Sequence, residues 1–206
     1  MDNTYALNGS YAKAGTMAGA LLAPLDAVRS AGLVVGFSLL TALAAQVAVP
    51  LPFTPVPVTA QVYAVLLTGA LLGPRLGALS MFAYLLEGAV GLPFFAGGRG
   101  GAAHLLLSPT AGYLWAFPVA AFVAGHFAER GWDRRYLTAA AAMALGSLVV
   151  IAGGFLGLLR FLAPAQAFAQ GVLPFLFGDV VKVALAAAAL PSGWALLRRR
   201  SGTPQA

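Results

Sequence analysis

Long apolar runs, interrupted by short polar or glycine- and proline-rich breaks, set the pattern of the chain. The runs are about 16 to 25 residues long, which is the length of a membrane-spanning helix and longer than a strand of a membrane barrel. The pattern therefore predicts an all-α, polytopic membrane protein with six transmembrane helices. The predicted helices cover residues 31–49, 58–73, 76–92, 113–128, 137–159 and 172–197.

The composition supports a membrane setting and excludes several classes of protein. Hydrophobic residues make up 60% of the 206 positions and charged residues 9%, whereas soluble domains carry about 25% charged residues. The formal net charge of +6 does not indicate nucleic-acid binding, because the basic residues lie between and after the apolar runs. The absence of cysteine excludes a disulfide framework, a thiolate metal site and a cysteine nucleophile.

The distribution of Lys and Arg predicts the orientation of the six helices. Nine basic residues fall on one side of this topology and two on the other, while Lys182 lies within a helix. Since Lys and Arg concentrate in cytoplasmic loops, both termini should be cytoplasmic, in a cell inner or plasma membrane. The nine are Lys13, Arg29, Arg75, Arg130, Arg134, Arg135, Arg198, Arg199 and Arg200, and the two are Arg99 and Arg160.

One membrane domain without internal repeats is expected. Residues 29–198 form this six-helix domain, between an N-terminal cytoplasmic or interfacial segment (1–28) and a short basic cytoplasmic tail (199–206). The N-terminal segment does not indicate a cleaved signal peptide. Pro24 and Asp26 interrupt its short apolar stretch, and no clear small-x-small cleavage site follows.

Asp179 and Lys182 stand out because they lie inside the last apolar run. An ionisable group inside a membrane costs about 2.5 to 3.5 kcal/mol on insertion scales, so such groups usually mark a functional site. The i,i+3 spacing places both residues on one helix face. A ligand-binding pair is one interpretation, and a buried ion pair that only joins helices is the other. Glu87 is a further charge in an apolar run, interpreted as a ligand contact, a proton site, or a partner of Arg99 or Lys182.

The predicted topology brings these charges to a similar depth in the outer half of the membrane. At a rise of about 1.5 Å per residue, Glu87 lies about 12 Å below the outer end of its helix, and Asp179 and Lys182 lie about 10 to 15 Å below theirs. The outer segments 50–57 and 97–101 could cover them. Because non-helical backbone at membrane depth needs surrounding protein or a wet cavity, we expect a pocket open to the outside.

Other features have less specific interpretations. His104 is expected to be a hydrogen-bonding group of the outer loop, not a metal ligand, because no second histidine is near it in sequence. The glycine-rich segment 96–112 lacks the Lys and Ser/Thr spacing of a phosphate-binding loop. The small residues Ser38, Ala42 and Ala45 fit close helix packing, either inside the protein or against another subunit.

Five segments carry longer motifs: ALAAQVAVPLPFTPVPVTAQ (42–61), LLGPRLG (71–77), YLLEGAVGLPFFAGGRGG (84–101), SPTAGY (108–113) and PFLFGDVVK (174–182). In this order and spacing they resemble the BioY family, the biotin-binding S components of energy-coupling-factor vitamin transporters. The resemblance extends over nearly all of residues 30–197. One departure is that Ser108 and Ala111 stand where the family usually has glycine, which concerns the shape of one loop.

The resemblance implies a substrate-binding subunit, not an enzyme, that captures biotin from outside. Asp179 and Lys182 match the family's binding motif, where a carboxylate accepts the ureido N–H donors and an ammonium donates to the ureido carbonyl. Arg99 is the candidate for the tail carboxylate, and aromatic residues near the outer ends would wall the apolar ring. The remaining expected binding residues are Glu87, Tyr84 and Tyr113.

The resemblance also implies partners. A membrane coupling subunit would dock on the helix that carries Ser38, Ala42 and Ala45, and separate ATP-binding subunits would supply energy, because the chain has no ATPase motif. Uptake without a dedicated partner set stays open. No cofactor, metal or nucleic acid is expected, and biotin is the transported ligand.

Two alternatives remain at this level. An S component for another small vitamin would share the fold and would differ in the ligand. An intramembrane hydrolase or transferase would need a nucleophile with a base, and the candidates are Ser147 and His126, which we expect near the cytoplasmic side and outside any motif.

Overall fold

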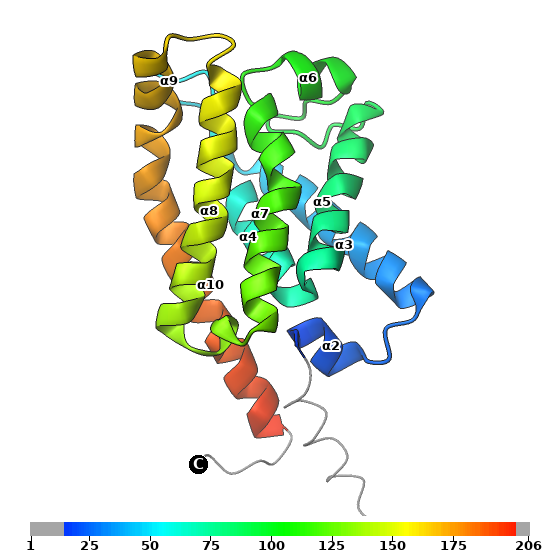
Figure 1. Ribbon diagram of the computed structural model, residues 1–206. Helices are drawn as coiled ribbons and strands as arrows, with labels where there is room; N and C mark the ends of the chain where they lie inside the picture. The colour runs from blue at the N-terminus through cyan, green and yellow to red at the C-terminus, as the bar shows by residue number, and fades with distance from the viewer. Residues whose placement is uncertain (1–14, 201–206) are drawn as a thin grey trace, which may run out of the picture.

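Six long helices form the body of the protein, and each coincides within a few residues with a predicted segment. The computed structural model describes residues 15–200, apart from the side chains of 177, 199 and 200. Figure 1 shows a helix bundle in which α7 stands between α8 and α5. The long helices are α3 (Ala27–Gln46), α4 (Gln61–Leu72), α5 (Pro74–Ala89), α7 (Ala111–Glu129), α8 (Tyr136–Leu158) and α10 (Leu173–Arg200).

Short elements close the two ends of the bundle. The loop with strands β1 and β2, helix α6 and helix α9 gather at one end, and α2 lies at the other end with the last turns of α10 (Figure 1). β1 and β2 pair antiparallel, with Ala48 opposite Thr59. The short elements are α2 (Met17–Leu22), β1 (Ala48–Val49), β2 (Val58–Thr59), α6 (Ala102–Leu107), η1 (Trp132–Arg134) and α9 (Pro164–Gly171).

The described helices identify a multi-pass membrane protein. Four stretches are long and apolar enough to cross a membrane: Ala27–Gln46, Ala111–Glu129, Tyr136–Leu158 and Pro164–Arg198. Large apolar side chains are exposed along them, as expected for helices that face lipid, and Leu43 is one example at 69% exposure. α4 has only 12 residues and α5 only 16. Of the six predicted spans, four therefore have the length and hydropathy of a spanning helix, and the other two stay predictions.

Glycine allows the central helices to approach closely. A Cβ added to Gly69 of α4 would lie 2.1 Å from the carbonyl oxygen of Ala121 in α7, so no side chain fits there. Gly112 of α7 and Gly157 of α8 pack backbone to backbone in the same way. Without a hydrophobic force between helices in lipid, such contacts are a main source of association. They fix α7 at the centre, against α4, α5 and α8.

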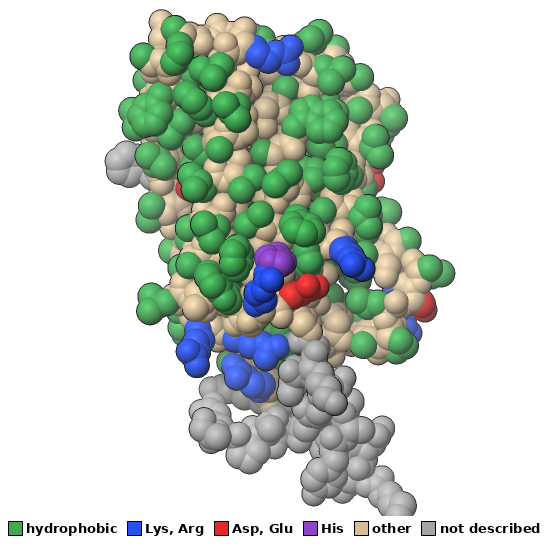
Figure 2. Space-filling view, viewed as in Figure 1, with side chains coloured by type: hydrophobic (Ala, Val, Ile, Leu, Met, Phe, Trp, Pro, Cys, Tyr) green, Lys and Arg blue, Asp and Glu red, His purple; other side chains and the backbone are tan. Residues whose placement is uncertain are grey.

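Basic side chains gather at the end that carries α2 and the last turns of α10. Figure 2 shows most of the visible Lys and Arg there. The predicted topology likewise concentrates Lys and Arg on one side of the membrane, which it assigns to the cytoplasm. Of the nine residues that carried the prediction, Lys13 lies outside the described residues, as do the side chains of Arg199 and Arg200. Most of the expected N-terminal segment and most of the tail, residues 1–14 and 201–206, also lie outside them.

Candidate binding site

A cavity of about 480 Å³ lies between the helices near the end that carries β1, β2 and α6. Most of its lining is apolar or aromatic, with a small number of polar side chains, which is the usual character of a small-molecule site. The position fits the predicted pocket in the outer half of the membrane. The lining residues are Val56, Pro57, Thr59, Gln61, Val62, Phe95, Ala96, His104, Thr110, Tyr113, Leu114, Phe117, Val150, Phe175 and Lys182.

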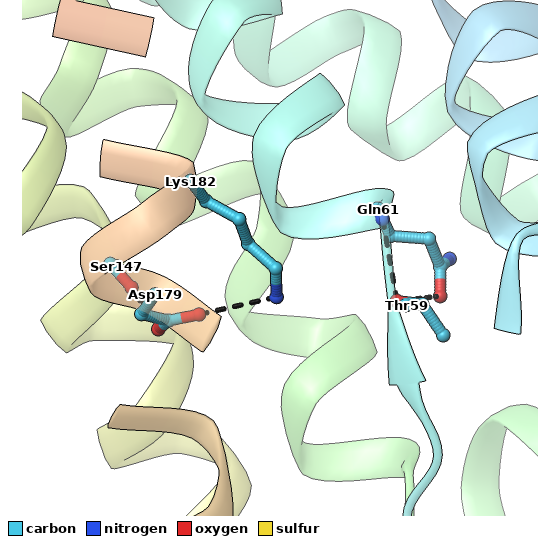
Figure 3. A network of polar contacts seen from close by, with 5 residues as sticks. All are labelled: Thr59, Gln61, Ser147, Asp179 and Lys182. Atoms are coloured by element: carbon cyan, nitrogen blue, oxygen red, sulfur yellow. Dashed lines mark hydrogen bonds and ion pairs between the residues drawn. The ribbon is translucent and has the colours of Figure 1, made fainter. Parts of the chain in front are cut away.

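The charged pair of α10 stands at this cavity. Lys182 Nζ donates to Asp179 Oδ1 over 3.2 Å, and the two side chains are 13% and 10% exposed. Lys182 is part of the cavity wall, and Asp179 lies behind it. Ser147 of α8 donates to the other carboxylate oxygen, Oδ2 (Figure 3). The predicted pairing on one helix face is confirmed, and the carboxylate is held on both oxygens.

Two neutral polar residues face the charged pair from the opposite wall (Figure 3). Thr59 Oγ1 donates to Gln61 Oε1 over 3.2 Å. Gln61 Nε2 donates to the Tyr84 hydroxyl over 2.6 Å, and that hydroxyl donates to the Phe94 carbonyl over 3.1 Å. Tyr84 therefore lies behind the wall and orients the Gln61 amide. Sequence reasoning missed Thr59 and Gln61, although both lie inside a motif segment, because a neutral polar residue beside an apolar run has no distinctive pattern.

Arg99 lies beside this cavity, in the loop that precedes α6. A second cavity of about 740 Å³ is lined by Arg99 and shares Pro57, Ala96, His104 and Thr110 with the first. The loop that carries Arg99 is closed by a bridge between Arg99 and Phe95, with backbone hydrogen bonds of 2.8 and 3.2 Å. Arg99 therefore lines a cavity that adjoins the one lined by Lys182, and its role in binding stays a prediction.

His104 of α6 lines both cavities. Its Nε2 lies 3.2 Å from Thr110 Oγ1, and its ring stacks on Phe95 with 5.4 Å between centroids. Burial, and secondarily the positive charge of Arg99, lowers the pKa of His104, so the imidazole is neutral near pH 7. The predicted hydrogen-bonding role of His104 is confirmed by this contact. Residues 15–200 contain no cluster of three His, Cys, Asp or Glu side chains that could hold a metal ion.

Tyr113 contributes an aromatic wall. It lines the cavity, and its ring packs at a tilt on Phe175 with 5.6 Å between centroids. Its hydroxyl donates to the Gly171 carbonyl over 2.5 Å. The hydroxyl is therefore occupied by the turn between α9 and α10, and the ring face is the part offered to the cavity.

Glu87 and the small residues of α3 lie at a different place. Ser38 Oγ lies 3.1 Å from Glu87 Oε1, which joins α3 to α5, and Glu87 is not among the residues that line the cavity. Ser38, Ala42 and Ala45 are buried within the molecule. Their burial favours packing inside the protein over a contact with another subunit, and the docking assignment stays a prediction. Within the described chain, Glu87 forms no ion pair with Arg99 or Lys182.

Ser147 and His126, the candidate nucleophile and base of the enzyme alternative, have separate partners. Ser147 donates to Asp179 beside the cavity. His126 stacks on Phe122 of its own helix, with 6.0 Å between ring centroids. A nucleophile and its base must lie within hydrogen-bond reach of one another, and this pair does not.

Known proteins resemble the chain over most of its length. A model of the BioY family matches residues 13–199. The chain is 46% identical over 158 residues to the "Probable biotin transporter BioY" of Pyrococcus horikoshii, which covers 77% of this chain and 91% of that protein. It is 38% identical over 176 residues to the "Biotin transporter BioY" of Rhizobium etli, covering 80% and 93% respectively.

A solved structure shares the fold. It is the crystal structure of the S-component for biotin from an ECF-type ABC transporter, with a TM-score of 0.71 and 25% sequence identity. The match covers 86% of this chain and 93% of the other. The helical arrangement described above is therefore that of an S component.

Proposed function

Because the chain belongs to the BioY family, we propose that it binds biotin from outside the cell and serves as the substrate-binding subunit of a biotin uptake transporter. The single observation that carries this proposal is the Asp179–Lys182 pair at the wall of a largely apolar cavity. The family is one of transporters, not of enzymes.

The chemistry of the cavity is complementary to biotin. The ureido ring offers two N–H donors and one carbonyl, which suit the carboxylate of Asp179 and the ammonium of Lys182 as charge-assisted hydrogen bonds. To admit the ring, Lys182 would turn toward the ureido carbonyl and uncover the Oδ1 atom that it now contacts over 3.2 Å. The thioether ring and aliphatic chain would pack on Tyr113, Phe117 and Phe175.

The tail carboxylate would lie toward the mouth. Arg99 lines the outer cavity, which shares four wall residues with the inner one. A ureido group at Lys182 and a carboxylate at Arg99 would orient the ligand along the line that joins the two cavities. A guanidinium binds a carboxylate through two parallel hydrogen bonds, and this contact would distinguish biotin from ligands without a charged tail.

The topology belongs to the same proposal. Six helices would cross the membrane, and α4 and α5, which have 12 and 16 residues, would be supported by the helices around them. The end rich in arginine would face the cytoplasm together with both termini. The cavity lies toward the opposite end and would open outward.

Energy for uptake would come from separate subunits. The sequence contains no phosphate-binding loop motif, and a membrane coupling subunit with ATP-binding subunits would supply the missing function. The proposed contact element is α3, of whose most apolar stretch only 17% is buried. Its outward face, with Leu39 and Leu43 exposed, is the preferred docking candidate over the buried small residues.

Competition binding tests the choice of ligand. Labelled biotin is bound to the purified protein, and unlabelled biotin and other vitamins of similar size are added in excess. Displacement by biotin alone supports the proposal. Displacement by another vitamin at lower concentration than biotin would assign the protein to that vitamin instead.

A further inference from the structure

Ser147 differs from the buried hydroxyl residues Thr68 and Ser80 in the partner of its hydrogen bond. Thr68 and Ser80 each donate to a carbonyl four residues earlier in their own helices. Such bonds leave the neighbouring helices unaffected. Ser147 instead donates from α8 to Asp179 Oδ2 in α10. A hydroxyl has a single proton to donate, and in Ser147 that proton is used between two helices.

The bond completes the environment of a buried carboxylate. Asp179 is buried, with Lys182 on Oδ1 and Ser147 on Oδ2. The two partners approach opposite oxygens, so together they fix the plane of the carboxylate. Each oxygen accepts about two hydrogen bonds, and therefore each retains a free position.

We propose that Ser147 is a positioning residue, which holds the Asp179 carboxylate in the orientation that receives the N–H donors of the ligand. This inference rests on the proposed function, in which Asp179 binds the ureido group. When Lys182 turns from Oδ1 to the ligand, Ser147 is the bond that keeps the carboxylate from rotating. Pre-orientation of this kind lowers the cost of ordering the site on binding.

The support for Ser147 is rigid. The neighbouring Gly146 lies under Leu66, at 2.4 Å from an added Cβ, and Val150 one turn later lines the cavity. α8 is thereby packed against α4 at the level of Ser147. A binding group is placed most accurately when its supporting residue lies on a packed helix.

Replacement of the hydroxyl tests the role. Ser147→Ala should weaken biotin binding by about 5- to 20-fold, because a buried charged acceptor loses a hydrogen bond. Ser80→Ala is the matched control: this serine is also buried but bonds only within its own helix, and its biotin affinity should stay at the wild-type value. Thermal unfolding without ligand measures the stability of both variants. Unchanged affinity in a folded Ser147→Ala variant overturns the proposal.

A double-mutant cycle separates positioning from a general effect on the fold. In the Asp179→Asn background the hydroxyl no longer meets a charged acceptor, so Ser147→Ala should cost only about twofold in affinity. Equal losses in both backgrounds would show that Ser147 acts independently of Asp179, and would overturn the proposal.

If Ser147→Ala does not fold, Ser147→Thr, which keeps the hydroxyl, should bind biotin within about threefold of wild type. A folded Ser147→Thr that loses binding contradicts the role.

Different results would contradict the proposed function and the role of Ser147. Absence of biotin binding by the wild-type protein contradicts the proposed function itself. Biotin binding by the wild type, together with an unaffected Ser147→Ala variant, contradicts only the role of Ser147.

Discussion

At the scale of single residues, the site is a small set of polar groups in an apolar wall. Asp179 and Lys182 are costly in a membrane, and the structure gives each a partner within the pair. The sequence predicts this pair because charge in an apolar run is conspicuous. It does not predict that Ser147, Thr59 and Gln61 belong to this site, because hydroxyl and amide groups are common in helix packing. Only the fold shows which of them lie near the charged residues.

Asp179→Asn should weaken biotin binding more than tenfold and leave the fold intact. The amide keeps the shape of the carboxylate but replaces a charged acceptor with a neutral group that presents a donor to a donor. Loss of a charged hydrogen bond in a desolvated site costs about 1.5 to 3 kcal/mol. Equilibrium binding of labelled biotin measures the loss, and wild-type affinity in the folded variant would make Asp179 purely structural.

Arg99→Ala should reduce the affinity for biotin far more than for biotin amide, whose tail is uncharged. Arg99 lines the outer cavity, and an ion pair with the tail is the contact that the variant removes. The expected loss for biotin is about tenfold, with a smaller change for the amide. Equal losses for both ligands would indicate that Arg99 shapes the loop and does not bind the tail.

Asp133 offers a test by pH. It is buried in the turn between α7 and α8 and accepts a hydrogen bond of 2.5 Å from Trp194 Nε1. Burial raises the pKa of Asp133 from 3.8 to about 6, although the bond from Trp194 and the charge of Arg134 lower it. A raised pKa in the folded state means that folding favours the protonated acid. Its contribution to stability is therefore present below pH 3.8 and lost as pH rises through about 6.

Asp133→Asn should consequently stabilise the protein near pH 7.5 and have little effect near pH 4. The amide keeps an acceptor for Trp194 and removes a buried charge. The free energy of unfolding near pH 7.5 should therefore rise by about 1 to 3 kcal/mol. Thermal unfolding in detergent at both pH values measures the difference. An Asp133→Asn variant that is no more stable than wild type at pH 7.5 would show that the carboxylate charge is well compensated.

At the scale of elements, hydropathy predicts the long helices well and their faces poorly. The predicted segment 137–159 and the observed α8, Tyr136–Leu158, differ by one residue at each end. The spacing of Ser38, Ala42 and Ala45 shows that they share a face, but the same spacing fits an inward or an outward face. The structure turns them inward, and Ser38 contacts Glu87. The short elements α2 and α9 were not predicted, because one or two helical turns give too little periodicity.

Tryptophan substitutions on α3 distinguish its two faces. Ala45 is fully buried, so Ala45→Trp should destabilise the fold and abolish both biotin binding and uptake. Leu43 is exposed, so Leu43→Trp should leave biotin binding by the purified protein unchanged. If α3 contacts the coupling subunit through that face, Leu43→Trp lowers uptake in cells. Normal uptake by a folded Leu43→Trp variant would remove this face from the proposed docking surface.

At the scale of the whole molecule, the cavity and the arginine-rich end lie at opposite ends of the bundle. The absence of cysteine allows single cysteines to report topology without further changes. Phe53→Cys, in the exposed loop between β1 and β2, should react with a membrane-impermeant maleimide in intact cells. Arg135→Cys, exposed at the other end, should react only after permeabilisation. The reverse pattern would contradict the proposed orientation.

The central claim is that this cavity binds biotin, and calorimetric titration of the purified wild-type protein tests it most directly. The account predicts saturable binding of one biotin per chain, with more than tenfold weaker binding by Asp179→Asn measured under the same conditions. A folded wild-type protein that releases or absorbs no heat on titration over a range of temperatures, and retains no labelled biotin, would contradict it.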